Sequence, residues 1–156
     1  GQFDAAGAVE AVRRLDDTRL VDEASGWYDQ GGGDVDSRHN YFYPLRIRPG
    51  GRTVALSEYG GIAWPMPGHE PPGKTYGYGT AKDKADLTKR YKMLQWKTIL
   101  PQLGRGLSAL VYTQLTDVED EVNGLFTYDR AAIKPDPAAV RAVNQALEAA
   151  FEKTVE

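Results

Sequence analysis

The sequence contains no cysteine and only two histidines, His39 and His69. The absence of cysteine excludes disulfides, thiol catalysis and thiolate metal sites, and two histidines make a zinc site improbable. No apolar stretch approaches the ~20 residues that cross a bilayer, and residues 1–10 lack the basic-then-apolar order of a signal peptide. We expect a soluble protein, cytoplasmic or secreted.

An excess of charge of one sign is also missing. Nineteen lysines and arginines stand against 22 aspartates and glutamates, which gives a net charge of -3 with no run of like charges. This balance favours small or neutral polar partners over nucleic acid or an anionic membrane. The 156 residues are 41% hydrophobic and include nine tyrosines, four phenylalanines and three tryptophans, enough for a folded core. The first residue is Gly1 rather than methionine, which suggests a processed or excised piece.

Hydrophobic periodicity predicts an alternation of helices and strands, which indicates an α/β fold with a parallel sheet. The predicted helices comprise residues 5–15 after an Asp4 cap, residues 82–103 with Pro101 disturbing the last turn, and a C-terminal helix that Asp136 caps and Pro137 opens. The predicted strands comprise residues 20–24, 35–43, 53–58 and 107–114. A glycine- and proline-rich loop is expected over residues 59–80, and the Asn123-Gly124 pair signals a tight hairpin turn.

Two motifs are weaker than they look. Residues 68–75 fit the phosphate-loop pattern GxxxxGK[ST], but Pro71 and Pro72 remove backbone N–H donors, and no helix follows Thr75. We therefore reject nucleotide binding there. The acidic segment 117–121 lacks the alternating spacing of a calcium loop, so a solvated or substrate-facing loop is favoured over a metal site.

Polar and aromatic residues close three of the predicted strands. Glu58 ends an apolar strand, and the segments 39–41 and 112–114 end its predicted neighbours. Since the carboxyl ends of parallel strands meet at one rim, these side chains should converge as a carbohydrate site requires. A plainer interpretation remains open, in which Glu58 is an exposed surface glutamate while His39 and Tyr41 satisfy each other at the rim.

The residues that end these strands resemble glycoside hydrolase family two, the family of β-galactosidases, β-glucuronidases and β-mannosidases. The likeness lies in Ser57-Glu58-Tyr59-Gly60, in the strand end at residues 39–41 and above all in residues 111–130, and it covers essentially the whole chain. It implies that residues 1–156 are a single incomplete domain, the C-terminal half of a (β/α)8 TIM barrel with strands five to eight and their helices.

The resemblance also implies roles for individual residues. Glu58 matches the family's nucleophile, and Tyr41 matches the tyrosine that hydrogen-bonds to it. The expected substrate-binding residues are His39, Asn40, Trp64, Tyr112, Gln114, Asp117 and Glu119. No metal or cofactor is implied.

A retaining glycosidase needs a second carboxyl group, an acid/base about 5 to 5.5 Å from the nucleophile. In the family this group is the glutamate of an Asn-Glu pair, which is often followed by Gly-Trp-Gly-Gln-Phe. This chain begins Gly1-Gln2-Phe3, which matches the end of that run. We therefore expect the acid/base to precede Gly1 and the isolated chain to be inactive on β-galactosides or β-glucuronides. Exposed sheet edges predict pairing with the missing N-terminal half-barrel or self-association into a homodimer. The alternative is a non-catalytic carbohydrate-binding or interaction module of the same fold.

Overall fold

The computed structural model describes residues 3–23, 26–42, 44–48 and 50–155. These residues form an α/β fold built on an open sheet of three parallel strands in the order β1-β2-β3. The strands are β1 (Val35–Asn40), β2 (Thr53–Gly60) and β3 (Leu107–Thr113). The predicted parallel arrangement is confirmed, and it brings the carboxyl ends of all three strands to one edge of the sheet.

The central strand β2 carries the apolar residues that anchor the sheet. Val54 and Leu56 are almost completely buried, as expected for a parallel strand with neighbours on both sides. The pairing register shifts between Arg38 and His39 in β1, so that His39 lies opposite Glu58. This irregularity places two of the predicted site residues side by side.

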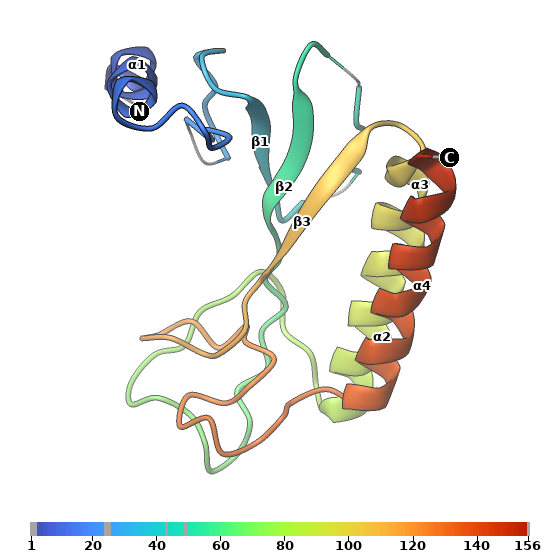
Figure 1. Ribbon diagram of the computed structural model, residues 1–156. Helices are drawn as coiled ribbons and strands as arrows, with labels where there is room; N and C mark the ends of the chain where they lie inside the picture. The colour runs from blue at the N-terminus through green and yellow to red at the C-terminus, as the bar shows by residue number, and fades with distance from the viewer. Residues whose placement is uncertain (1–2, 24–25, 43, 49, 156) are drawn as a thin grey trace.

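Helices cover one side of the sheet (Figure 1). A continuous helical segment consists of α2 (Lys84–Leu94), a π turn labelled η1 (Gln95–Ile99) and α3 (Leu100–Leu103). It packs beside the C-terminal helix α4 (Pro137–Val155), next to β3. The core lies between these helices and the sheet and includes Leu56, Leu87, Ile99, Leu107 and Leu147. The remaining helix, α1 (Ala5–Leu15), lies beyond β1.

Local signals placed most helix ends correctly. The Asp4 carboxylate accepts a hydrogen bond from the Gly7 N–H, and the Asp136 carboxylate accepts from the first turn of α4. The predicted helix over residues 82–103 is confirmed in outline, and Pro101 does not end it. The wider π turn ends at Ile99, two residues before Pro101. It includes Lys97, whose carbonyl the proline ring would meet in a regular α-helix.

The prediction of half a TIM barrel is wrong. Only three strands form within the described residues, and they make an open sheet rather than four consecutive barrel strands. The missing strand is the one predicted over residues 20–24, of which 20–23 are described and are not in a strand. Leu20 is exposed there, and the Val21 N–H donates to the Asp34 side chain instead of a sheet partner.

Two long loops continue from the carboxyl ends of β2 and β3 and pack against each other at the lower end of the molecule in Figure 1. Backbone hydrogen bonds join them at Trp64 N to Val122 O, Tyr76 N to Asp120 O and Val122 N to Tyr76 O. The Asn123-Gly124 pair lies inside this arrangement, with Asn123 buried, and does not connect two of the named strands. The loops enclose the edge at which Glu58 lies.

The β1-to-β2 connection contains no helix in residues 41, 42, 44–48 and 50–52. The Tyr43 end of the predicted second strand lies outside the described residues. Across the described parts of the chain, no helix is both long enough and apolar enough to cross a membrane.

Candidate functional site

Glu58 and Tyr41 are in direct contact at the carboxyl ends of β2 and β1. The Tyr41 hydroxyl donates to Glu58 Oε2 at 2.5 Å. A phenol has one proton to give, so the Thr113 hydroxyl, 3.3 Å from the Tyr41 oxygen, acts as the donor to it. Residues from the ends of all three strands are thereby connected.

His39 approaches the same carboxylate oxygen. Its Nδ1 lies 3.3 Å from Glu58 Oε2, and its side chain is almost fully buried, while the Glu58 side chain is 42% exposed. Within the described residues, the Tyr41 hydrogen bond and the His39 contact both fall on Oε2, and no hydrogen bond reaches Oε1. The carboxylate is therefore held in orientation and keeps one oxygen for an incoming group.

Burial and the hydrogen bond to Glu58 raise the pKa of Tyr41 well above its ordinary value. The hydrogen bond with Tyr76 and, to a smaller extent, burial raise the pKa of Tyr78 to about 12. Both phenols are therefore neutral through the physiological range, and Tyr41 remains a proton donor to Glu58.

Glu58 opens into a pocket of about 280 Å³ between the two loops. Polar and acidic groups dominate its lining, which consists of Tyr41, Glu58, Tyr78, Thr113, Gln114, Val118, Glu119, Asp120 and Glu121. The pocket offers carboxylates, hydroxyls and an amide, the groups that hydrogen-bond to a polar, hydroxyl-rich ligand.

Tyr78 fixes the ring of Tyr41 from the side. The two rings stack with their centroids 3.8 Å apart and an angle of 6° between their planes. Gly61 makes the approach possible, because a Cβ at this position would lie 2.7 Å from the Tyr78 ring and 2.9 Å from the Tyr41 ring. Its φ of +62° also favours glycine.

Trp27 adds an exposed aromatic surface beside His39 and Tyr41. Its ring centroid lies 5.7 Å from that of His39 and 6.5 Å from that of Tyr41, and the residue is 55% exposed. An exposed tryptophan provides an apolar face on which the C–H surface of a sugar can pack.

Two of the predicted substrate-binding residues, Gln114 and Glu119, line the Glu58 pocket. The Gln114 amide donates to Glu121 Oε2 at 3.2 Å and to Asn123 Oδ1 at 2.7 Å. The Asn123 amide donates to the same Glu121 oxygen at 3.0 Å. These contacts fix the Glu121 carboxylate at the pocket wall.

Asp117, also predicted as a rim contact, is instead buried inside the loop. Lys134 Nζ lies 2.8 Å and 3.1 Å from its two carboxylate oxygens and donates to the Val122 carbonyl at 2.8 Å. Burial raises the pKa of Asp117 and lowers the pKa of Lys134, while their mutual attraction opposes both shifts. This buried pair fixes the loop that carries Glu119 and Glu121.

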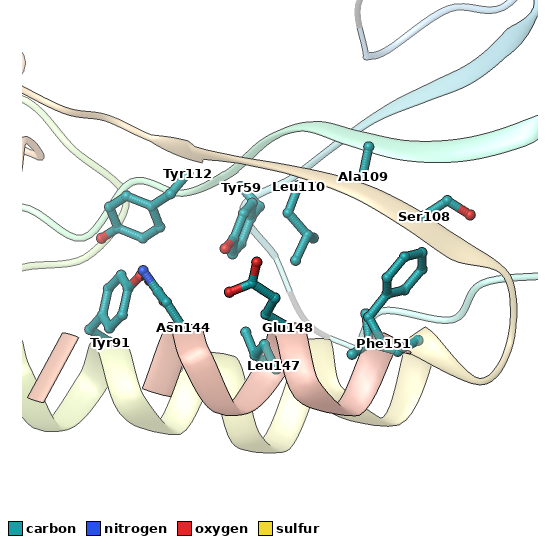
Figure 2. Close-up of a pocket in the computed structure, with 11 residues that line it drawn as sticks. Tyr59, Tyr91, Ser108, Ala109, Leu110, Tyr112, Asn144, Leu147, Glu148 and Phe151 are labelled. Carbon is teal, nitrogen blue, oxygen red and sulfur yellow. Dashed lines mark hydrogen bonds between the residues drawn. The ribbon is translucent and has the colours of Figure 1, made fainter. Parts of the chain in front are cut away.

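Tyr112 also lies away from Glu58, on the helix side of the sheet. It lines a separate pocket of about 540 Å³ between β3 and α4. Figure 2 shows its ring close to that of Tyr91, with Asn144 and Glu148 projecting from α4 toward the same space. Its ring packs edge-on against Tyr91 and Tyr59, so its surroundings are those of a core aromatic.

The last two predicted residues have structural contacts outside the Glu58 pocket. The Asn40 side chain accepts a hydrogen bond from the Phe42 N–H at 3.2 Å. Trp64 is half-buried and packs against the core. A direct sugar contact by either residue remains a prediction without support from the pocket geometry.

The structure adds residues that the sequence had not singled out as site residues: Trp27, Tyr78, Thr113 and Glu121. Thr113 lay inside the strand-end segment already noted, and Tyr78 belongs to the alternating Tyr-Gly pattern of the long loop. Trp27 follows a segment predicted as a strand, and no local pattern indicates that it lies beside Tyr41. Within the described ranges, no group of three histidine, aspartate or glutamate side chains is arranged to hold a metal ion.

No protein-family model matches the sequence, and a search of curated proteins likewise finds no match.

Proposed function

We propose that this chain supplies the nucleophile of a retaining β-glycosidase, with Glu58 in that role and Tyr41 as the residue that orients it. The observation that carries the proposal is the 2.5 Å hydrogen bond between Tyr41 and Glu58 in a pocket of about 280 Å³. A carboxylate with one oxygen fixed and the other open suits attack on a carbon atom. The neighbouring hydroxyls, amide and exposed Trp27 suit a sugar.

In the proposed reaction, Glu58 Oε1 attacks the anomeric carbon, and the bond from that carbon to the leaving oxygen breaks. An acid protonates the leaving oxygen, and a glycosyl ester of Glu58 results. Water, deprotonated by the same acid/base group, then attacks the anomeric carbon and releases the sugar and the free carboxylate. Tyr41 holds Glu58 in position and donates to it while the carboxylate is regenerated.

The acid/base is proposed to come from outside this chain, and the isolated chain is expected to be inactive. The pocket has three further carboxylates, at Glu119, Asp120 and Glu121. Glu121 accepts two amide hydrogen bonds through one oxygen, which suits a positioned acceptor better than a proton donor. A Glu121→Gln variant that lost only activity toward substrates with poor leaving groups would assign the acid role to Glu121 instead.

The outer edges of β1 and β3 pair with no other strand among the described residues. Unpaired edges of a parallel sheet favour association with another chain or segment. Self-association, or docking of a segment that carries the acid/base, thus remains a prediction. A monomer in light scattering over a range of concentrations would count against self-association.

The test is removal and chemical rescue of the nucleophile in the full-length product of the gene that encodes these residues. Glu58→Ala should lower kcat on 4-nitrophenyl β-galactoside or β-glucuronide by about 10⁴-fold or more. Added azide should restore turnover and yield the α-glycosyl azide, because azide then attacks from the face that Glu58 occupied. Glu152→Ala, on the exposed side of α4, is the matched control and should leave activity unchanged.

A non-catalytic sugar-binding role predicts a different result. The same sugars would bind, with Trp27 and Glu58 contributing to affinity, but the full-length product would not turn over aryl glycosides and azide would change nothing. Sugar affinity without turnover would therefore select that role over catalysis.

A further inference from the structure

The helical segment formed by α2 and η1 has a basic outer face. Residues 82–97 include six lysines and arginines against two aspartates, although the whole chain has a net charge of -3. Lys89 and Lys92 are three residues apart in α2, Lys84 lies about two turns before Lys92, and Lys97 follows in the π turn. Because the lysines are separated in sequence, they form no run of like charges, and the helix alone gathers them.

These lysines are exposed and are not neutralised by the fold. Lys84, Lys89, Lys92 and Lys97 lie at the surface, and within the described chain none of them forms an ion pair. The two aspartates of the segment have other partners than these four lysines. Asp83 caps the helix through the Asp86 N–H, and the Asp86 carboxylate pairs with Arg90.

An apolar strip runs through the lysines. Met93 and Trp96 are each 41% exposed. Together with the lysines they line a shallow groove of about 760 Å³, whose other lining residues are Ala85, Thr88 and Asp136. Asp136 accepts hydrogen bonds from the first turn of α4. Tryptophan and methionine are enriched at the centres of protein interfaces, so the groove combines an apolar centre with a cationic border.

The rest of the molecule restricts what can occupy this groove. A membrane-surface helix buries its apolar face in lipid, but the apolar face of α2 is already in the core through Leu87, Tyr91 and Leu94. A nucleic acid extends beyond one helix face, and the remainder of this chain is strongly acidic. A short acidic segment, by contrast, can contact the basic face alone. This face is about 20 Å long, the length of three to four helical turns.

We propose that the groove formed by Lys84, Lys89, Lys92, Met93, Trp96 and Lys97 is a docking site for an acidic peptide segment of a partner protein. The carboxylates of the partner would lie against the lysines, and one of its apolar side chains would contact Met93 and Trp96. This site lies apart from the Glu58 pocket and shares no lining residue with it.

The test measures binding of a fluorescein-labelled dodecapeptide of glutamate and aspartate with two leucines and a phenylalanine, by fluorescence anisotropy. The peptide should bind the chain, and the double variant Lys89→Glu with Lys92→Glu should weaken binding by about tenfold or more. Trp96→Ala should also weaken binding, which separates an apolar contact from charge attraction alone. The matched control, Lys74→Glu with Lys153→Glu, makes the same charge change at exposed lysines elsewhere and should leave the affinity within about twofold.

Three results would overturn the proposal. The first is no binding of the acidic peptide, or equal binding of its glutamine counterpart. The second is equal weakening by the control variant, because the attraction would then be that of the whole chain. The third is tighter binding of a 20-nucleotide single-stranded DNA, or of vesicles containing phosphatidylserine, with the same dependence on Lys89 and Lys92. Unchanged circular dichroism for each variant verifies that folding is not the cause.

Discussion

Replacing Lys134 by methionine tests how strongly the loop around the Glu58 pocket depends on one buried cation. The Lys134 side chain is completely buried, and its three contacts are to both oxygens of Asp117 and to the Val122 carbonyl. Methionine preserves much of the volume and removes the charge and the donors. The variant therefore leaves a carboxylate buried without its cation and a carbonyl without its partner.

Removing one member of a buried ion pair costs about 3 to 5 kcal/mol, a large part of the roughly 5 to 15 kcal/mol that stabilises a typical domain. The Gly124 N–H still donates to Asp117 at 2.7 Å, which supports the lower end of this range. Burial already raises the pKa of Asp117, and loss of Lys134 raises it further. Protonation of Asp117 therefore stabilises the folded variant more than the folded wild type. The difference in stability between the two should shrink as the pH falls.

Urea unfolding at pH 7.5 and pH 5, followed by tryptophan fluorescence, measures both effects. Lys153→Met, at an exposed lysine of α4, is the control and should change stability by less than about 0.5 kcal/mol. A loss below about 1 kcal/mol for Lys134→Met at pH 7.5 would refute the reasoning. A stability difference between wild type and Lys134→Met that grew from pH 7.5 to pH 5 would refute the role assigned to Asp117.

Three further predictions concern the site and its surroundings. Tyr41→Phe removes the donor to Glu58 and, on the proposed function, should lower kcat about 10- to 100-fold with little change in KM, because a hydrogen bond to a charged group contributes roughly 1.5 to 3 kcal/mol; equal kcat would remove Tyr41 from the mechanism. Gly61→Ala should lower the free energy of unfolding by about 1 to 3 kcal/mol, since φ is +62° and two tyrosine rings lie within 3.0 Å of the added Cβ; an unchanged melting temperature would contradict this. Hydrogen bonds, the largest from the Thr127 hydroxyl, lower the pKa of Asp129 below its usual value. Asp129 therefore stabilises the fold above about pH 4, and this contribution is lost as the pH falls through the lowered pKa. Thermal melts of Asp129→Asn should differ from wild type at pH 6 and converge toward pH 2, and a constant difference would argue against this linkage.

The sequence predicted those parts of the fold that local rules determine. Asp136 and Pro137 mark the start of α4 because a cap and a first-turn proline act within a few residues. The apolar run of β2 fixed the centre of the sheet for similar reasons. The strand predicted over residues 20–24 is wrong for the described residues 20–23, where Leu20 is exposed and the Val21 N–H donates to the Asp34 side chain rather than to a neighbouring strand.

The site was predictable only in part. Strand-end position brought His39, Tyr41 and Glu58 together, since the carboxyl ends of parallel strands share an edge. Strand alternation sends adjacent side chains to opposite faces, so Thr113 reaches Tyr41 while Tyr112 faces α4. Asp117 looked like an exposed acid because its partner Lys134 is 17 residues away. The lysines of α2 are separated in the sequence, and only the folded helix brings them to one groove.

The most direct test of the central claim is covalent trapping of the nucleophile. A 2,4-dinitrophenyl 2-deoxy-2-fluoro-β-glycoside needs little acid assistance, so the label should form on the nucleophile and persist there. Peptide mass spectrometry of the full-length gene product, inactivated with the galactoside or the glucuronide reagent, should find the fluorosugar on Glu58. Inactivation with the label on another carboxylate, and none on Glu58, would contradict the account.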